Sequence, residues 1–301
     1  MLRHGTYSIV AHDSSTGEVG VAVQSHWFSV GSLVPWTRPG VGAVAVQSVP
    51  DPAVGTRLLD RLEAGEAPDA ALRAELDADE QAEFRQTAVV AADGRTAVHT
   101  GAMCMAYAGE AGGTGFTCQA NVMASERVWG AMADTFSTST QGPLARRMLA
   151  ALHAAEAAGG DVRGRQSCAI VVAPAAGEPW RKTVDLRVED APEPLEEMAR
   201  LLDVHDAYTL ATEGDDHVAA GRTEAAGEAF RRAAELAPDN HELLFWAGLA
   251  AVQGGQTELG LKQVRRAIEL QPGWAELLPR LPPLFAPAAP EVSAALGLAQ
   301  R

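Results

Sequence analysis

Cysteine is scarce in this chain of 301 residues, and long apolar runs are absent. The three cysteines, Cys104, Cys118 and Cys168, are too few and too widely spaced for a disulfide framework or a CxxC metal knuckle. No stretch approaches the run of about 18 apolar residues that a transmembrane helix needs. The first residues contain neither an apolar h-region nor a small-residue cleavage site. These absences predict a protein of the reducing cytoplasm, without a membrane-spanning segment.

Basic residues are also in short supply. The 24 Lys and Arg residues stand against 39 Asp and Glu residues, which gives a formal net charge of −15. The acidic residues are spread along the chain rather than gathered in a tail. A surface of this sign disfavours nucleic acid and anionic lipid, so we expect neither as a partner. Small-molecule and peptide substrates remain possible, because a pocket can be locally basic.

Motifs for nucleotides and metals are missing as well. No GxGxxG follows the first β-like run, and no GxxxxGK[ST] occurs anywhere in the chain. The eight histidines form no HExxH motif and no pair spaced four residues apart. The sequence therefore predicts no metal and no cofactor.

What the chain does contain, up to about residue 190, is alternating apolar and polar residues in short runs. Two helices are expected within residues 53–76, broken at Gly65 and Pro68, and another helix around Leu144–Ala155. Strands are expected at residues 6–12, 18–25, 41–47, 116–124, 167–174 and 182–188, together with a hairpin over residues 86–99. Antiparallel hairpins with clustered helices favour an α+β layered fold over a doubly wound sheet.

Beyond residue 200 the sequence repeats itself with an offset of 34 residues. The triplet Arg231-Arg232-Ala233 recurs as Arg265-Arg266-Ala267, and Gly214 recurs as Gly248. Such a period is typical of the tetratricopeptide repeat, in which small residues let paired helices approach closely. We therefore predict two domains: residues 1–205, and residues 206–301 with two helical repeats and capping helices.

Two repeats are fewer than the three that usually stand alone. We expect them to pack on the main domain or on a second subunit, in a homo-oligomer, and to offer a surface for a protein partner.

Thr6 is the most informative residue for chemistry, because it begins the first predicted strand and follows a glycine. If residues 1–5 were removed, Thr6 would carry both a nucleophilic hydroxyl and a basic α-amine. Gly5 fits self-cleavage, since a residue without Cβ lets the hydroxyl reach the preceding carbonyl. The alternative is that Gly5-Thr6 merely begins a strand.

Several blocks of the sequence resemble one family. These blocks are TYSIVAHD, GEVGVAVQS and PGVGAVAVQS, followed by GGDVRGRQSCAIVV and VDLRVED, and the similarity covers roughly residues 4–205. They resemble the prokaryotic family called domain of unknown function 1028. The resemblance implies a four-layer αββα sandwich similar to N-terminal-nucleophile hydrolases, with the nucleophile at the start of a central strand. It supplies no activity. Relatives typically open with Met directly before the Thr, whereas five residues precede Thr6 here.

Other candidates are residues that fall beside Thr6 or on loops. Ser8 shares the face of Thr6 and could orient its amine, or could be a polar core residue. Asn121 could donate to an oxyanion, and Gln119 is a weaker candidate; both amides could instead tie strands together. Asp161 could hold the amine and Arg163 a carboxylate, or the two could simply pin their loop. Gln166 or Ser167 could point a donor into a pocket, whereas Ser25 and Gln47 are weaker candidates.

Two functions remain open at this point. The first is hydrolysis of an amide C–N bond in a small or peptidic substrate, with Thr6 as the nucleophile. The second is non-catalytic: a hydrolase-like domain that serves the repeats, which would recruit a partner or a second copy of the chain.

Overall fold

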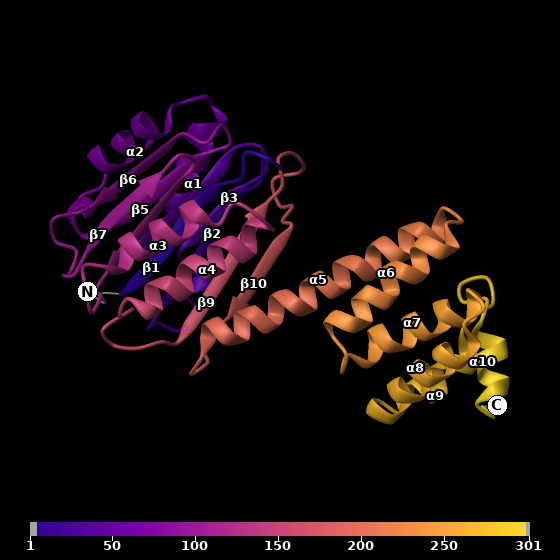
Figure 1. Cartoon of the computed structure of the whole chain (residues 1–301). Helices are drawn as coiled ribbons and strands as arrows, with labels where there is room; N and C mark the ends of the chain where they lie inside the picture. Colours follow the sequence, from indigo (N-terminus) through magenta and orange to yellow (C-terminus); the bar gives the residue numbers. More distant parts are fainter. Residues whose placement is uncertain (1–4, 299–301) are drawn as a thin grey trace. The chain divides into compact units, whose positions relative to one another are not determined.

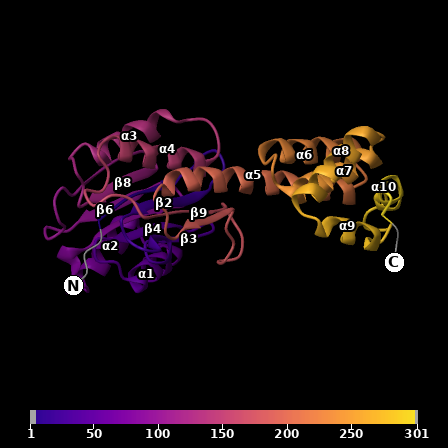
Figure 2. The ribbon, with the colours of Figure 1, turned by 90° about the horizontal axis from the view of Figure 1, so that it is seen from below.

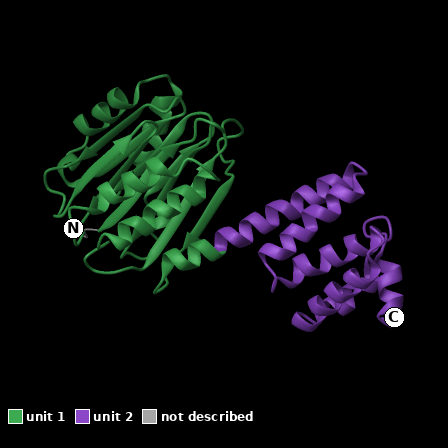
Figure 3. Ribbon diagram, viewed as in Figure 1, with its two compact units in different colours: residues 1–200 green, residues 201–301 purple. Residues whose placement is uncertain are grey.

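The computed structural model describes residues 5–298, and the chain divides into two compact units, one ending at Arg200 and the other beginning at Leu201 (Figure 3). The division lies five residues before the boundary that we predicted. The first unit combines antiparallel sheets with helices, and the second contains helices, so the predicted α+β class is confirmed. Within residues 5–298, no helix has both the length and the apolar character needed to cross a bilayer.

The first unit contains a six-stranded antiparallel sheet, which we call the first sheet. Its central strand β1 carries Thr6 at its start and pairs with β2 on one side and β8 on the other. In spatial order the strands are β10 (Val184–Val188), β9 (Ser167–Ala173), β2 (Val19–Ser25), β1 (Thr6–His12), β8 (Phe116–Asn121) and β7 (Gly109–Gly113).

A second antiparallel sheet of four strands packs face to face on the first. The strands in order are β3 (Pro35–Arg38), β4 (Gly42–Gln47), β5 (Gln86–Ala91) and β6 (Thr96–Thr100). The predicted hairpin over residues 86–99 is confirmed as β5 and β6, with Gly94 at a positive φ of 82° in the turn.

Helices cover the outer faces of both sheets, which gives four layers (Figures 1 and 2). On the second sheet lie α1 (Pro52–Glu63) and α2 (Pro68–Asp77), and on the first sheet lie α3 (Val128–Thr138) and α4 (Leu144–Ala157). The break between α1 and α2 at Gly65 is the predicted one. The start of α1 follows from sequence, because the Asp51 side chain accepts from the backbone N–H of Ala53 and Pro52 occupies the first turn.

Between the two sheets lies a layer of side chains from their facing sides, which we call the inter-sheet layer. Strand alternation divides β1 cleanly: Thr6, Ser8 and Val10 lie on one face, and Tyr7, Ile9 and Ala11 on the other. Val10 belongs to the apolar cluster between the sheets, whereas Thr6 and Ser8 are buried polar residues on the same face. The inter-sheet layer therefore changes from apolar to polar toward the start of β1.

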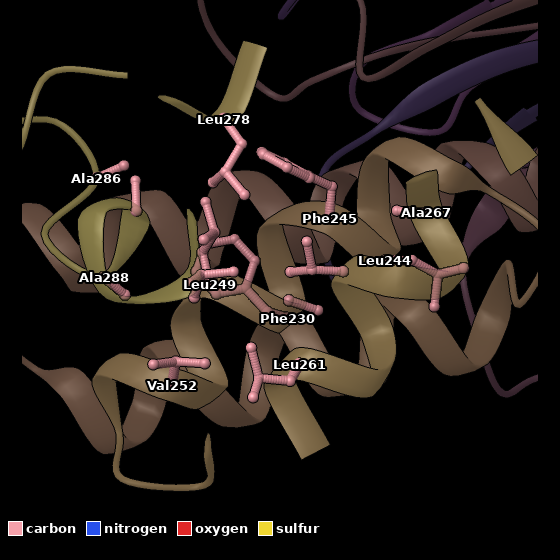
Figure 4. Close-up of a cluster of buried hydrophobic side chains, with 14 of the residues drawn as sticks. Phe230, Leu244, Phe245, Leu249, Val252, Leu261, Ala267, Leu278, Ala286 and Ala288 are labelled. Atoms are coloured by element: carbon pink, nitrogen blue, oxygen red, sulfur yellow. The ribbon is translucent and has the colours of Figure 1, made fainter. Parts of the chain in front are cut away.

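The second unit repeats a helical hairpin. Helices α6 (Thr223–Leu236) and α8 (Thr257–Leu270) begin and end 34 residues apart, as the repeat predicts. The remaining helices are α5 (Pro194–Ala219), which begins in the first unit, α7 (His241–Gln253), α9 (Gly273–Leu277) and α10 (Ala289–Ala295). Glycine is required at Gly248, where a Cβ would lie 2.7 Å from Val264 Cγ2. Phe230, Phe245 and Leu261 are among the residues that fill the core of this unit (Figure 4).

Candidate functional site

Thr6 begins β1 at the polar end of the inter-sheet layer and is fully buried. Its strand partners are Ser25 on β2 and Asn121 on β8. The Thr6 hydroxyl donates a hydrogen bond to Ser25 Oγ at 3.1 Å, and Ser25 Oγ donates in turn to the carbonyl oxygen of Gly5 at 2.5 Å. One serine hydroxyl therefore contacts both the proposed nucleophile and the carbonyl of the peptide bond that precedes it.

The Gly5 carbonyl has a second side-chain donor. Arg163 Nη2 donates to it at 2.9 Å, and the same guanidinium forms a fork with Asp161, Nε to Oδ1 at 3.1 Å and Nη2 to Oδ2 at 2.8 Å. Asp161 is buried and also accepts from the backbone N–H of Arg163 at 2.9 Å. A bidentate, charge-assisted pair fixes the plane of the guanidinium. The carbonyl thus lies between one neutral and one cationic donor.

The loop that carries Asp161 and Arg163 is fastened to the end of β8. Asp161 forms a β-bridge with Met123, and the backbone N–H of Ala124 donates to the Gly160 carbonyl at 3.0 Å. Gly160 itself has a positive φ of 58°, and a Cβ there would lie 2.7 Å from Glu156 Oε2. This glycine lets the chain turn tightly after α4, so the loop reaches the start of β1 on a rigid support.

Val122, which follows β8, adopts a left-handed backbone with φ of 61°. Such a conformation is unusual for a β-branched residue and costs about 1–3 kcal/mol. Hydrogen bonds hold it on both sides, from its own N–H to the Met105 carbonyl at 3.0 Å and from the Val162 N–H to its carbonyl at 3.1 Å. Backbone strain concentrates at functional sites, and this residue lies directly beside Gly5.

A buried amide network lies behind Thr6. Ser8 Oγ donates to Gln47 Oε1 at 2.6 Å and accepts from Gln119 Nε2 at 2.5 Å. Gln86 Oε1 accepts from both Gln47 Nε2 at 2.9 Å and Asn121 Nδ2 at 3.0 Å. These residues join the two sheets, because Gln47 and Gln86 are a paired couple in the second sheet.

The amide of Asn121 reaches the carbonyl of Thr6, at 3.5 Å, and Gln47 Nε2 reaches that same carbonyl at 3.3 Å. The side-chain donors on the Gly5 carbonyl are instead Ser25 and Arg163. The structure therefore brings Thr6, Asp161 and Arg163 together around Gly5, and it places Ser8, Gln119 and Asn121 in the adjoining network.

Gln166 and Ser167 have other partners. Gln166 Nε2 donates to Asp190 Oδ1 at 3.2 Å on the surface. Ser167 Oγ donates to the Trp27 carbonyl at 2.5 Å and accepts from the Val30 N–H at 3.1 Å. Neither residue contributes a hydrogen bond to the Gly5 carbonyl among these contacts.

Sequence reasoning ranked Ser25 low and did not single out Gln86. Ser25 ends its strand on the same face as Val21 and Val23, so alternation could have placed it on the inter-sheet face, although its position opposite Thr6 depends on the register between β1 and β2. Gln86 had no comparable signal, because its meeting with Gln47 depends on the register between β4 and β5.

The environment of the thiols disfavours cysteine chemistry. Burial raises the pKa of Cys118 and of Cys168, and burial is also the main reason that the pKa of Cys104 is raised. A raised pKa keeps these thiols protonated and unreactive near neutral pH. Within residues 5–298, no three His, Cys, Asp or Glu side chains converge to hold a metal ion.

Next to Thr6, Tyr7 anchors the start of β1 to α4. Its hydroxyl donates to Glu156 Oε2 at 2.5 Å, and burial, followed by the negative charge of Glu156, raises the Tyr7 pKa well above its ordinary value. Tyr7 therefore remains neutral and acts as a hydrogen-bond donor. The contact helps to hold Thr6 in place relative to the helix from which the Asp161 loop departs.

Comparisons with known proteins agree with this architecture. The model of the Family of unknown function (DUF1028) matches residues 6–198. The crystal structure of protein SPO2555 from Silicibacter pomeroyi, also described as DUF1028, is similar at 30% sequence identity with a TM-score of 0.60. That similarity covers 66% of this chain and 88% of the other. No curated protein matches. With a match over most of the first unit, from the strand that begins at Thr6 onward, the chain belongs to the DUF1028 family.

Proposed function

We propose that this chain is an amide-bond hydrolase whose nucleophile is Thr6, freed by loss of residues 1–5. The observation that carries the proposal is the position of the Gly5–Thr6 peptide bond. Its carbonyl oxygen accepts from Ser25 Oγ and Arg163 Nη2, and the neighbouring Thr6 hydroxyl contacts the same serine. An amide carbonyl held by two donors beside a hydroxyl is the arrangement that acyl transfer requires.

Cleavage of the Gly5–Thr6 bond follows from the same groups. Thr6 Oγ attacks the Gly5 carbonyl carbon through a five-membered ring, and the negative charge that forms on oxygen is stabilised by Ser25 and Arg163. The C–N bond then breaks, the hydroxyl proton passes to the departing Thr6 nitrogen, and an ester remains. Water hydrolyses that ester, which releases residues 1–5 as a carboxylic acid and leaves Thr6 with a free α-amine.

The freed chain would act on substrates by the same steps. The α-amine, whose ordinary pKa is about 7.7–8.0, accepts the hydroxyl proton and then donates it to the leaving amine. Thr6 Oγ attacks the substrate carbonyl, and the acyl-enzyme is hydrolysed by water. Asp161 keeps the Arg163 guanidinium in its plane and lies beside Gly5, the residue bonded to the nitrogen that becomes the α-amine. Ser8 and Asn121 hold the backbone of β1 through the amide network.

Intact mass and a covalent probe test the proposal together. We expect purified protein to lose the mass of residues 1–5 on incubation, and an acylating probe to label Thr6 in the shortened chain. Thr6→Ala is the control, because it lacks the attacking oxygen and should keep its full mass. Full-length wild-type protein without label on Thr6 would exclude the proposed nucleophile.

A non-catalytic role is the second candidate, and one feature of the second unit favours it. A groove of about 920 Å³ lies between α6, α7 and α8, lined by residues that include Glu228, Ala250 and Leu259. Repeated helical hairpins use such surfaces to bind partner segments. A protein that stays full-length and unlabelled but retains a partner through this groove would support the scaffold function.

A further inference from the structure

The space around the Cα of Gly5 is closed. A Cβ at this position would lie 2.6 Å from Asp161 Oδ2, 2.7 Å from Arg163 Nη2 and 2.8 Å from Val122 Cβ. Real Cβ atoms essentially never approach other heavy atoms closer than 3.0 Å. Three different side chains therefore exclude an L-side chain from the residue that supplies the carbonyl.

Each of these three side chains is held in place, so none can move away from an added Cβ at low energetic cost. The Asp161 carboxylate is held by the backbone N–H, Nε and Nη2 of Arg163. Arg163 is held in turn by that carboxylate and by the Gly5 carbonyl. Val122 is fixed in its left-handed conformation by backbone hydrogen bonds on both sides. The shape of the space is thus determined by contacts that persist without Gly5, apart from the one to its carbonyl.

This space is also where the acyl group of a substrate would lie. When Thr6 Oγ attacks the Gly5 carbonyl, nitrogen and oxygen are both bonded to one carbon within a five-membered ring. The acyl carbon consequently moves little when its bond changes from nitrogen to oxygen. A substrate acyl group on Thr6 Oγ therefore occupies the position of Gly5, with its carbonyl oxygen on the same Ser25 and Arg163 donors.

We infer that the substrates of this site are glycyl amides, in which the acyl carbon is followed by an unsubstituted CH₂ group, and that Val122, Asp161 and Arg163 exclude acyl groups with an L-side chain at that carbon. The inference rests on the proposed function, because it takes Thr6 as the acceptor of the acyl group. It adds a selectivity that the nucleophile alone does not imply.

Binding of the product acid tests the inference without requiring turnover. The probes are N-acetylglycine and N-acetyl-L-alanine, and the protein is the chain that begins at Thr6, which retains all of β1. Titration calorimetry should show N-acetylglycine binding at least about tenfold more tightly than N-acetyl-L-alanine, since one unaccommodated methyl group costs this much or more. Equal binding of the two acids, or binding of neither, overturns the inference.

A variant that removes one of the three excluding side chains makes the test specific to the space around Gly5. Val122→Gly removes the Cβ that faces Gly5 and relieves the positive φ, so the protein should fold and bind N-acetyl-L-alanine more nearly like N-acetylglycine. If the ratio of the two affinities is the same in this variant as in the wild type, Val122 is not one of the residues that exclude the methyl group.

Hydrolysis of the matching 4-nitroanilides separates the two claims. Faster release of 4-nitroaniline from N-acetylglycyl-4-nitroanilide than from the L-alanyl compound supports both the hydrolase function and the selectivity for glycyl groups. Discrimination in binding without release from either anilide would contradict the proposed hydrolase and leave the glycine-shaped site supported. Equal release from both anilides would overturn the site's selectivity and leave the hydrolase supported.

Discussion

The two halves of the inter-sheet layer share the strands β1, β2, β4 and β5 and differ completely in chemistry. One half is apolar, and its buried side chains include Val10, Val21, Val23, Ala43, Ala45, Ala88 and Val90. The other half is polar, and its fully buried side chains include Thr6, Ser8, Ser25, Gln47, Gln86, Gln119 and Asn121. Within β1 the change occurs between Ser8 and Val10, two positions apart on the same face.

The two halves have different roles: the apolar half stabilises the fold, and the polar half positions Thr6. Burial of the apolar half stabilises the fold without directional demands. In the polar half, each donor and acceptor loses its water and must be bonded inside the protein, so burial there contributes little net stability. The bonding is incomplete, since Asn121 Oδ1 has no hydrogen-bond partner among the residues described. A network of this kind is better explained by the need to hold Thr6 and its backbone in one position.

The largest expected effect follows from exchanging the nucleophile. In the chain that begins at residue 6, Thr6→Ala should reduce amidase activity by at least about a thousandfold, because no other hydroxyl takes its place on the strand. The melting temperature should change little, since within residues 5–298 the Thr6 hydroxyl makes one side-chain hydrogen bond, the one to Ser25. Steady-state kinetics with a glycyl anilide and thermal unfolding measure the two effects.

Val10→Ala is the matched control on the same face of the same strand. It should leave activity unchanged at a temperature where the protein is folded, and lower the free energy of unfolding by about 2 kcal/mol through the cavity it creates. Comparable loss of activity in both variants would show that the two halves of the layer do not divide the roles in this way.

The next largest effect is expected at Gln86. Gln86→Met keeps a long side chain but removes the acceptor of Gln47 and Asn121 and the donor to the Gly109 and Ala120 carbonyls. Several buried polar groups lose their partner at once, so the free energy of unfolding should fall by about 3 kcal/mol or more. Urea unfolding measures the loss.

A double-mutant cycle with Gln47→Met shows whether the network acts as a unit. Because replacing both partners leaves fewer unpaired groups than replacing one, the double variant should be more stable than the sum of the single losses, by about 1 kcal/mol or more. Additive losses would mean that the two glutamines are independent of one another.

A smaller effect is expected when Arg163 is exchanged for lysine. A lysine keeps the charge but cannot bond both Asp161 and a carbonyl in one plane, so KM should rise about tenfold while the melting temperature changes little. Arg57→Lys is the control, since Arg57 also pairs with a buried carboxylate, that of Glu75, far along the chain from the site. A large drop in melting temperature with unchanged kinetics in Arg163→Lys would make Arg163 a structural residue.

Sequence alone could place Thr6 and Ser8 on one face, because a period of two residues is visible without any partner strand. It also predicted most strands and the repeat, since each shows a local pattern. The strands β3 and β7 were missed: β3 begins at Pro35, and β7 has glycine at three of its five positions, so neither shows alternating apolar side chains. Helix α3 was missed as well, in a segment with Gly, Ser and Thr among its residues.

The site was harder to predict than the fold. The expected role of Asn121 as an oxyanion donor depended on which carbonyl its amide reaches. Because Asn121 lies opposite Thr6 in the pairing of β8 with β1, its amide reaches the Thr6 carbonyl. Likewise, Ser25 meets the Gly5 carbonyl because β1 and β2 pair with Ser25 opposite Thr6. A shift of one residue in either register would exchange these partners, and no local pattern specifies the register to one residue.

The smallest effect is expected just beyond the opposite end of β1, where Asp13 is a charged residue with no proposed role in the chemistry. Its carboxylate accepts from the N–H and hydroxyl of Ser15, at 2.8 and 2.6 Å, and pairs with Arg147 at 2.8 Å. Burial alone would raise the Asp13 pKa, but the hydrogen bonds from Ser15 and the charge of Arg147 outweigh it, so the pKa is lowered.

Because the folded pKa lies below the unfolded value of about 3.9, the ionised Asp13 stabilises the fold above that pH, and the contribution disappears as the pH falls through the folded pKa. Asp13→Asn keeps an oxygen that can accept from Ser15 but loses the charge, so it should cost about 1 kcal/mol at pH 7 and progressively less below about pH 4, with unchanged amidase activity. Asp93→Asn, at the exposed tip of the β5–β6 hairpin, is the control and should cost less. Urea unfolding at several pH values measures the loss of unfolding free energy in both variants. If the loss for Asp13→Asn stays constant down to pH about 2, the charge of Asp13 is not what stabilises this end of the strand.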